Sequence, residues 1–141
     1  MLAPILAALA ASLTPPPEPL KEQLQSAIWA DLQLNAVIGN GNWLGSLWYN
    51  AGSDTVSDLH IRELTCSRGG LVQRCSFALY RDGGPKAVMG ETAPDALICL
   101  ANFRKTDQRW SISHRPPHKA GHSQTSMRCK VLTKWTSAGG K

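Results

Sequence analysis

Residues 56–81 read VSDLHIRELTCSRGGLVQRCSFALYR, and this stretch decides the fold. Two runs of strand-forming residues, 56–66 and 72–81, flank a Gly-Gly turn signal. A tight turn at this point places Cys66 directly opposite Cys75. Opposed residues of a hairpin have Cβ atoms about 4.5–5.5 Å apart, which is within a small adjustment of disulfide geometry. The stretch therefore predicts a hairpin closed by a disulfide.

The cysteine count extends this prediction to the rest of the chain. The chain has four cysteines, and an even number in a small chain is typical of disulfides formed in an oxidising compartment. With Cys66 joined to Cys75, Cys99 is left to pair with Cys129. The alternative is a zinc site built from the four thiols, but no two cysteines have the close spacing that such sites use. We therefore expect two disulfides.

Further strands are predicted after the first hairpin. Residues 96–104 and 109–115 form a second hairpin around the turn 105–108, and residues 127–135 form a last strand that carries Cys129. With 66 and 75 opposed, alternation puts one set of side chains on the disulfide face: Leu64, Phe77 and Leu79. It puts a second set on the other face: Ile61, Ala78 and Tyr80. Pairing Phe103 with Trp110 gives the second hairpin an apolar face: Leu97, Cys99, Ala101, Phe103, Trp110 and Ile112.

One helix precedes these strands. Its apolar positions recur at three- and four-residue steps: Leu20, Leu24, Ala27, Ile28 and Leu32. Pro19 suits its first turn and Gly39 suits its end. The aromatic run at 43–49 follows a Gly/Asn turn, and it is interpreted as a plug over the sheet edge, or alternatively as a stacking platform for a ligand. The fold class is α+β, with one N-terminal amphipathic helix packed on a small antiparallel sheet of four to five strands.

The N-terminus indicates export. Residues 1–12 read MLAPILAALAAS, with a small-x-small motif at 8–10, although the segment is short and lacks the usual early Lys or Arg. A start codon placed too late would explain both defects. We expect an export signal and Pro-rich spacer at 1–17, one domain at 18–135 and a flexible tail at 136–141. The Pro-rich residues 13–19 are predicted to adopt neither helix nor strand. No transmembrane span is expected in the mature chain, which is predicted to be periplasmic or secreted.

The charge distribution is uneven along the chain. The formal net charge is +5, yet residues 1–95 carry six Lys or Arg against nine acidic residues, and residues 96–141 carry nine against one. A basic C-terminal part favours an anionic partner, such as an acidic protein, an envelope polymer or a lipid surface. The candidate anion-binding residues are Arg104, Lys105, Arg109, Arg115, Lys119, Arg128 and Lys130. Nucleic acid is the alternative partner, since Trp110 and Trp135 lie among these cations.

Two arrangements raise the alternative of an enzyme. His114, His118 and His122 recur every four residues and are weak candidates for metal ligands, although Pro116 and Pro117 exclude a helix there. With Phe103 paired with Trp110, Cys99 lies opposite His114 in the predicted second hairpin, which would suit a thiol nucleophile and its base.

No enzyme sequence motif is present, and we assign no catalytic residue and no cofactor. The prediction is a non-catalytic binding or envelope-structural domain that uses its basic C-terminal face.

Overall fold

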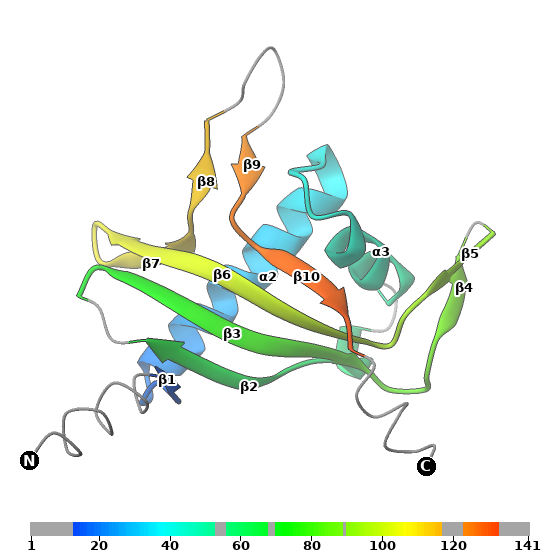
Figure 1. The fold of residues 1–141 in the computed structure, drawn as a ribbon, viewed down its shortest axis with the longest axis horizontal. Helices are drawn as coiled ribbons and strands as arrows, with labels where there is room; N and C mark the ends of the chain where they lie inside the picture. The colour runs from blue at the N-terminus through cyan, green and yellow to red at the C-terminus, as the bar shows by residue number, and fades with distance from the viewer. Residues whose placement is uncertain (1–12, 53–55, 68–69, 89, 117–122, 133–141) are drawn as a thin grey trace, which may run out of the picture.

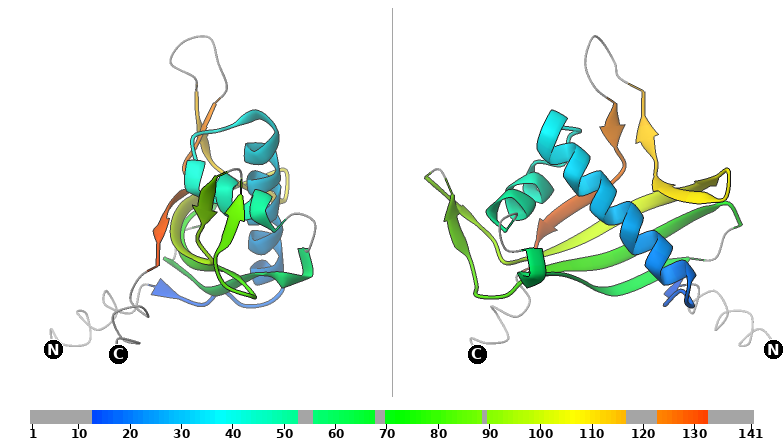
Figure 2. Two further views of the ribbon diagram at one scale, coloured as in Figure 1. Left: turned by 90° about the vertical axis from the view of Figure 1, so that its right-hand side faces the viewer. Right: turned by 180° about the vertical axis from the view of Figure 1, so that it is seen from behind.

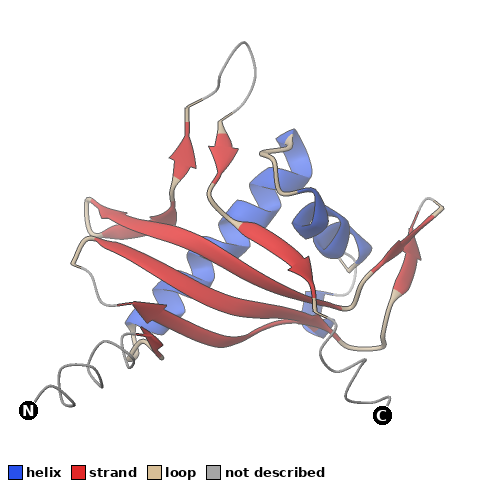
Figure 3. Cartoon of the chain, viewed as in Figure 1, coloured by secondary structure: helices blue, strands red, loops and turns tan. Residues whose placement is uncertain are grey.

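The computed structural model describes residues 13–52, 56–67, 70–88, 90–116 and 123–132. It confirms the α+β class, with one large antiparallel sheet and two α-helices behind it (Figure 1). The longer helix crosses the back of the sheet diagonally, as the view from behind shows (Figure 2). Both helices lie on the same side of the sheet, so the sheet has a covered face and an open face (Figure 3).

The longer helix, α2, spans Leu20–Ile38 and has the predicted boundaries. Its buried positions include the predicted apolar stripe, and they also include Asp31 and Asn35. The helix ends at Gly39, whose φ of 72° favours glycine. A short 3-10 helix, η1, spans Val56–Asp58 and precedes the first hairpin.

A second helix, α3, spans Trp43–Ala51, so the expectation of a single helix was wrong. Asn42 caps it, because its side chain accepts a hydrogen bond from the backbone N–H of Gly45 at 3.1 Å. The plug interpretation holds for Trp48, which is fully buried and stacks on Trp29 of α2 with ring centroids 6.2 Å apart. Trp43, in contrast, is 61 % exposed.

The main sheet has six strands, one more than the upper end of the expected range. Its members are β1 (Leu13–Thr14), β2 (Leu59–Ser67), β3 (Val72–Arg81), β6 (Ala96–Thr106), β7 (Arg109–Ile112) and β10 (Arg128–Val131). Two small two-stranded sheets complete the fold: β4 (Lys86–Val88) with β5 (Glu91–Ala93), and β8 (His114–Arg115) with β9 (Gln124–Thr125). The expectation that 13–19 holds no strand was wrong, because β1 pairs with β2.

The first hairpin confirms the opposed cysteines but contains a bulge. Cys66 lies opposite Cys75, and the register shifts between Arg62 and Thr65, where Glu63 adopts a left-handed φ of 58°. The extra residue reverses the alternation beyond it. Ile61 therefore packs against the core instead of lying on the other face, as the unbroken alternation had predicted.

The second hairpin has a different register from the predicted one. Phe103 lies opposite Ile112, not Trp110, because the turn contains only Asp107 and Gln108, both at positive φ. A shift of two residues leaves every side chain on its face. The six predicted apolar residues of this hairpin are all buried.

Both predicted disulfides are present, Cys66–Cys75 and Cys99–Cys129. Each joins directly opposed residues of neighbouring strands on the covered face of the sheet. There they contribute to one apolar core with residues of both helices, such as Ile28 and Trp48. In the part of the chain that the structure describes, no helix is long and apolar enough to cross a membrane.

Arg81, at the end of β3, is buried at 6 % exposure. Its guanidinium donates to the backbone carbonyls of Trp48, Ala93 and Pro94 at 2.7–3.1 Å. Burial lowers the pKa of Arg81, and the negative charge of Asp95 partly opposes this effect. The residue ties the end of α3 to the segment that enters β6.

Candidate functional site

The open face of the main sheet is basic. Residues that alternate with the buried positions of the strands point away from the helices. On β2, β3, β6 and β10, five of these outward residues are exposed cations: Arg62, Arg74, Arg104, Arg128 and Lys130. None of the outward positions of β3, β6, β7 or β10 holds Asp or Glu. On these four strands the positive charge of the open face is therefore not neutralised by outward acidic side chains.

Two strands that separate from each other, β7 and β10, share one edge of β6, and we call this arrangement the fork. β7 pairs with β6 at Phe103–Thr106 and β10 pairs with it at Leu97–Leu100, so the two strands share the edge opposite β3. Between them the chain leaves the sheet as β8 and β9, which pair with each other and extend beyond the edge of β6 (Figure 1).

The fork is held together around Asn102. The backbone N–H of Ser113 donates to the Asn102 carbonyl at 2.8 Å. Ser126 Oγ both accepts from the Asn102 N–H at 3.1 Å and donates to its carbonyl at 3.2 Å. Because backbone groups at an unpaired strand edge need partners, these bonds allow β7 and β10 to separate from each other without leaving the β6 edge unsatisfied.

A cavity of about 330 Å³ lies in the fork. Its charged walls are formed by three arginines from three different strands, Arg74, Arg115 and Arg128, and His114 lies beside them. The remaining lining residues are Leu100, Ala101, Asn102, Ser113 and Ser126. Three guanidiniums around one cavity favour a ligand that carries a phosphate or carboxylate group.

A buried polar cluster lies behind the cavity. The side chain of Asp31, on α2, is 4 % exposed, and its Oδ1 lies 2.5 Å from His114 Nε2. Its other oxygen accepts a hydrogen bond from Thr125 Oγ1 at 2.7 Å. Asp31 thus attaches both strands of the β8–β9 arm to the helix, because His114 lies on β8 and Thr125 on β9.

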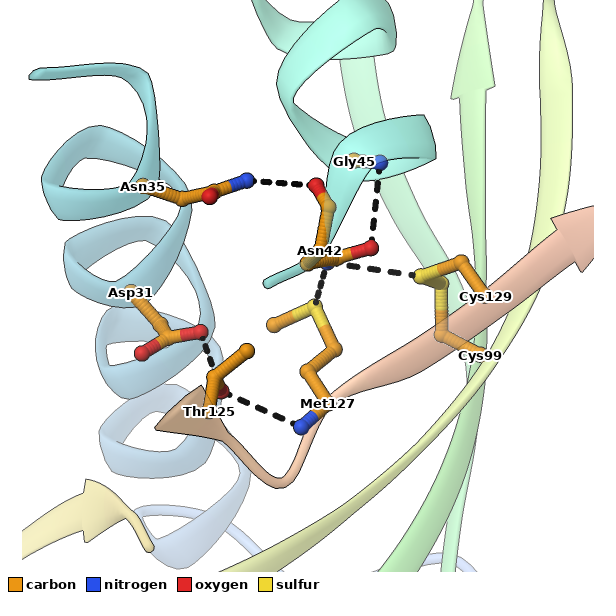
Figure 4. Close-up of a disulfide and its surroundings, with 8 residues drawn as sticks. All are labelled: Asp31, Asn35, Asn42, Gly45, Cys99, Thr125, Met127 and Cys129. Carbon is orange, nitrogen blue, oxygen red and sulfur yellow. Dashed lines mark hydrogen bonds between the residues drawn. A yellow bond between two sulfur atoms is a disulfide. The ribbon is translucent and has the colours of Figure 1, made fainter. Parts of the chain in front are cut away.

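Further polar contacts connect this cluster to the second disulfide (Figure 4). Thr125 Oγ1 accepts from the backbone N–H of Met127 at 3.1 Å. Asn42 Nδ2 lies 3.1 Å from the Met127 sulfur and 3.8 Å from that of Cys129, and Asn35 Nδ2 donates to the Asn42 carbonyl at 2.6 Å. The position of β10 in the fork is therefore tied to both helices.

The predicted anion-binding residues divide into separate groups. Arg104, Arg128 and Lys130 lie on the open face, and Arg115 lies at the cavity. Lys105 and Arg109 flank the β6–β7 turn outside this cavity, and Arg109 lines a different hollow against α2. Lys119 is outside the described residues.

The Cys99–His114 hypothesis was wrong. Cys99 is bonded to Cys129, and β7 ends at Ile112, so His114 lies on the β8–β9 arm instead of opposite Cys99. His118 and His122 lie outside the described residues. Within the residues that the structure does describe, no group of three His, Cys, Asp or Glu side chains could hold a metal ion.

Four residues of the open face and of the polar cluster were not predicted from the sequence: Arg62, Arg74, Asp31 and Ser123. Arg74 precedes Cys75 in a strand, so the alternation that turns Cys75 inward could have placed Arg74 on the open face. Arg62 lies opposite Ala78, and its guanidinium is 5.5 Å from the centroid of the Tyr80 ring. No sequence signal connects Asp31 with Ser123, because they are far apart in the chain.

Comparisons of this chain with models of protein families, with curated proteins and with solved structures give no match.

Proposed function

We propose that the protein is an exported, periplasmic or secreted binding domain that contacts an anionic partner through the open face of its sheet. The observation that carries the proposal is the convergence of Arg74, Arg115 and Arg128 on one cavity. Guanidinium groups bind phosphates and carboxylates through paired hydrogen bonds as well as through charge. The two disulfides support an oxidising compartment.

The surroundings of the cavity favour an extended partner over a single small anion. Arg104 and Lys130 lie on the same open face at positions further along β6 and β10. Exposed apolar side chains lie between the cations, and Leu100 is 54 % exposed directly opposite Arg128 in the register. A polymer or protein with several anionic groups could contact the cavity and these outer cations together.

Nucleic acid is the less favoured partner. The nucleic-acid hypothesis needs aromatic rings on which bases stack. Trp110 is 8 % exposed and belongs to the core, and Trp135 lies outside the described residues. The described basic face thus has cations for a phosphate backbone, but Trp110 does not add a stacking surface to it.

The test is the affinity of the protein for linear polyphosphate, measured by titration calorimetry at several salt concentrations. We expect log K to fall linearly with log salt, and we expect Arg128→Gln and Arg74→Gln each to reduce the slope by about 1. Lys21→Gln is the matched control, because Lys21 is an exposed cation on α2. Equal losses in all three variants would contradict a localised site. A higher affinity for double-stranded DNA than for polyphosphate would favour the nucleic-acid alternative.

A further inference from the structure

We propose that Ser123, His114 and Asp31 form a hydrolytic site that cleaves carboxylic esters carrying an anionic group. The geometry of the three side chains supports the hydrolytic site independently of the proposed function. The preference for an anionic ester rests on the proposed function, because it depends on the arginines of the fork cavity.

The three side chains form a continuous hydrogen-bonded chain. His114 Nδ1 lies 3.0 Å from Ser123 Oγ, and His114 Nε2 lies 2.5 Å from Asp31 Oδ1. Both distances meet the requirement for a nucleophile in contact with a base that a third group orients. The arrangement is assembled from α2, β8 and the residue before β9.

The carboxylate is the most buried of the three side chains. Ser123 is half-buried, the His114 side chain is 19 % exposed and the Asp31 side chain is 4 % exposed. A serine that attacks a substrate must be reachable, whereas the carboxylate that orients the histidine acts best when it is shielded from water. The partly exposed Ser123 and the buried Asp31 agree with both requirements.

The partners of Asp31 determine the role of each imidazole nitrogen. An ionised carboxylate only accepts hydrogen bonds, so Nε2 of His114 carries the hydrogen that faces Asp31. Nδ1 of the neutral ring then has a free lone pair toward Ser123 Oγ. Thr125 Oγ1 at 2.7 Å and Asn40 Nδ2 at 3.4 Å also donate to Asp31, which fixes the carboxylate in position.

The cavity provides the space and the charge for a substrate. His114 lines it, and the Oγ of Ser123 contacts the ring of this lining residue. A volume of about 330 Å³ suits a small acyl or alcohol group. Arg115 and Arg128 would hold the anionic group of the substrate and would favour negative charge that develops on the ester carbonyl oxygen.

The reaction is an acyl transfer to serine followed by hydrolysis. Ser123 Oγ attacks the ester carbonyl while Nδ1 of His114 takes the hydroxyl proton, and the new imidazolium is stabilised by Asp31. The bond to the alcohol breaks, and the alcohol leaves with the proton from Nδ1. Water then attacks the acyl group in the same way, which releases the acid and returns the proton to Ser123. No oxidant, reductant or further reactant is needed.

The first test is labelling with a fluorophosphonate probe, read by peptide mass spectrometry. We expect one label, on Ser123, and none on Ser123→Ala. His114→Gln and Asp31→Asn should reduce the labelling rate by about 10²–10⁴-fold. Ser26→Ala, an exposed serine on α2, is the matched control and should keep the wild-type rate.

A catalytic role is separated from a structural role by Ser123→Cys. This variant should fold like wild type by circular dichroism and should form a thioester-linked acyl intermediate with an activated ester, which Ser123→Ala cannot form. Absence of labelling and of hydrolysis in folded wild-type protein would overturn the proposal, and the cluster would then serve only to attach the arm to α2.

The substrate class is tested with the 4-nitrophenyl monoester of succinate against 4-nitrophenyl acetate. We expect a higher kcat/KM for the anionic ester, with Arg115→Gln raising its KM at least five-fold and lowering kcat/KM less for the acetate than for the succinate monoester. Equal kcat/KM values for the two esters would overturn the anionic preference. Wild-type protein that binds polyphosphate but is not labelled would leave the proposed binding function intact while the hydrolytic site fails.

Discussion

The two faces of the sheet differ sharply although the same strands build both. On β3 and β6 the covered face holds Phe77, Leu79 and Phe103, all fully buried against the helices. The opposite positions hold Arg74, Asn102 and Arg104. No described helix or strand covers this face of β3 and β6 (Figure 3). The covered face contributes stability, whereas the open face is the contact surface of the proposed function.

The comparison predicts its largest effect for a side chain on the covered face. Phe103→Ala should lower the free energy of unfolding by about 3–5 kcal/mol, because it leaves a cavity in the core. Leu100→Ala, on the open face of the same strand, should cost less than about 1 kcal/mol, since Leu100 is already 54 % exposed. Urea unfolding under oxidising conditions measures both. Similar losses would show that the open face is covered in solution.

The two disulfides of the covered face should differ in their contributions. The Cys99–Cys129 bridge spans 30 residues and the Cys66–Cys75 bridge spans 9. Loop-closure entropy then gives about 3.6 kcal/mol for the longer bridge and about 2.6 kcal/mol for the shorter one. Replacing each pair with alanines and comparing the unfolding midpoints measures the difference. The reverse order would mean that packing in the native state, rather than loop length, determines these contributions.

The attachment of the β8–β9 arm should contribute less than the core. Thr125→Val keeps the shape of the side chain but removes the hydrogen bond to the buried Asp31 carboxylate. We expect a loss of about 1–3 kcal/mol, because a buried acceptor loses one of its donors. Thr92→Val, at an exposed position of β5, is the control and should be nearly neutral. Faster hydrogen exchange confined to β8 and β9 would show that the arm detaches locally.

The smallest effect on stability is expected at the cations of the open face. Arg74→Gln should change the free energy of unfolding by less than about 0.5 kcal/mol, because the residue is exposed. The same variant is expected to weaken polyphosphate binding. A loss of stability comparable to that of Thr125→Val would contradict the view that Arg74 is free of a structural role.

The hairpin of residues 56–81 shows which structural features local sequence patterns can predict and which they miss. The opposed cysteines, the apolar face of β6 and β7, and the boundaries of α2 follow from periodicity and turn signals, and all were predicted. The bulge at Glu63 was not predicted, because one extra residue in a strand leaves no composition signal. The α3 helix was not predicted, because its aromatic run was interpreted as a plug that follows a Gly/Asn turn. Asn42, which caps this helix, was the sequence signal that could have indicated it.

The candidate site was predictable only in part. A basic C-terminal segment indicated Arg115 and Arg128, but the third arginine of the cavity, Arg74, comes from the part of the chain with a net negative charge. Charge summed along the sequence does not reveal which side chains a sheet brings together. The hydrogen bonds among Asp31, His114 and Ser123 could not be predicted for the same reason, since they join α2 to an arm that is far from it in the sequence.

The sequence by itself determined the α+β class, the two disulfides and the first helix, since these depend on spacings of a few residues or on the cysteine count. Only the tertiary structure decided where β7 and β10 separate on the edge of β6. That fork creates the cavity, brings arginines from three strands together and places His114 against a buried carboxylate. The physical reason is that such contacts depend on strand order and register across the whole sheet, which no local pattern specifies.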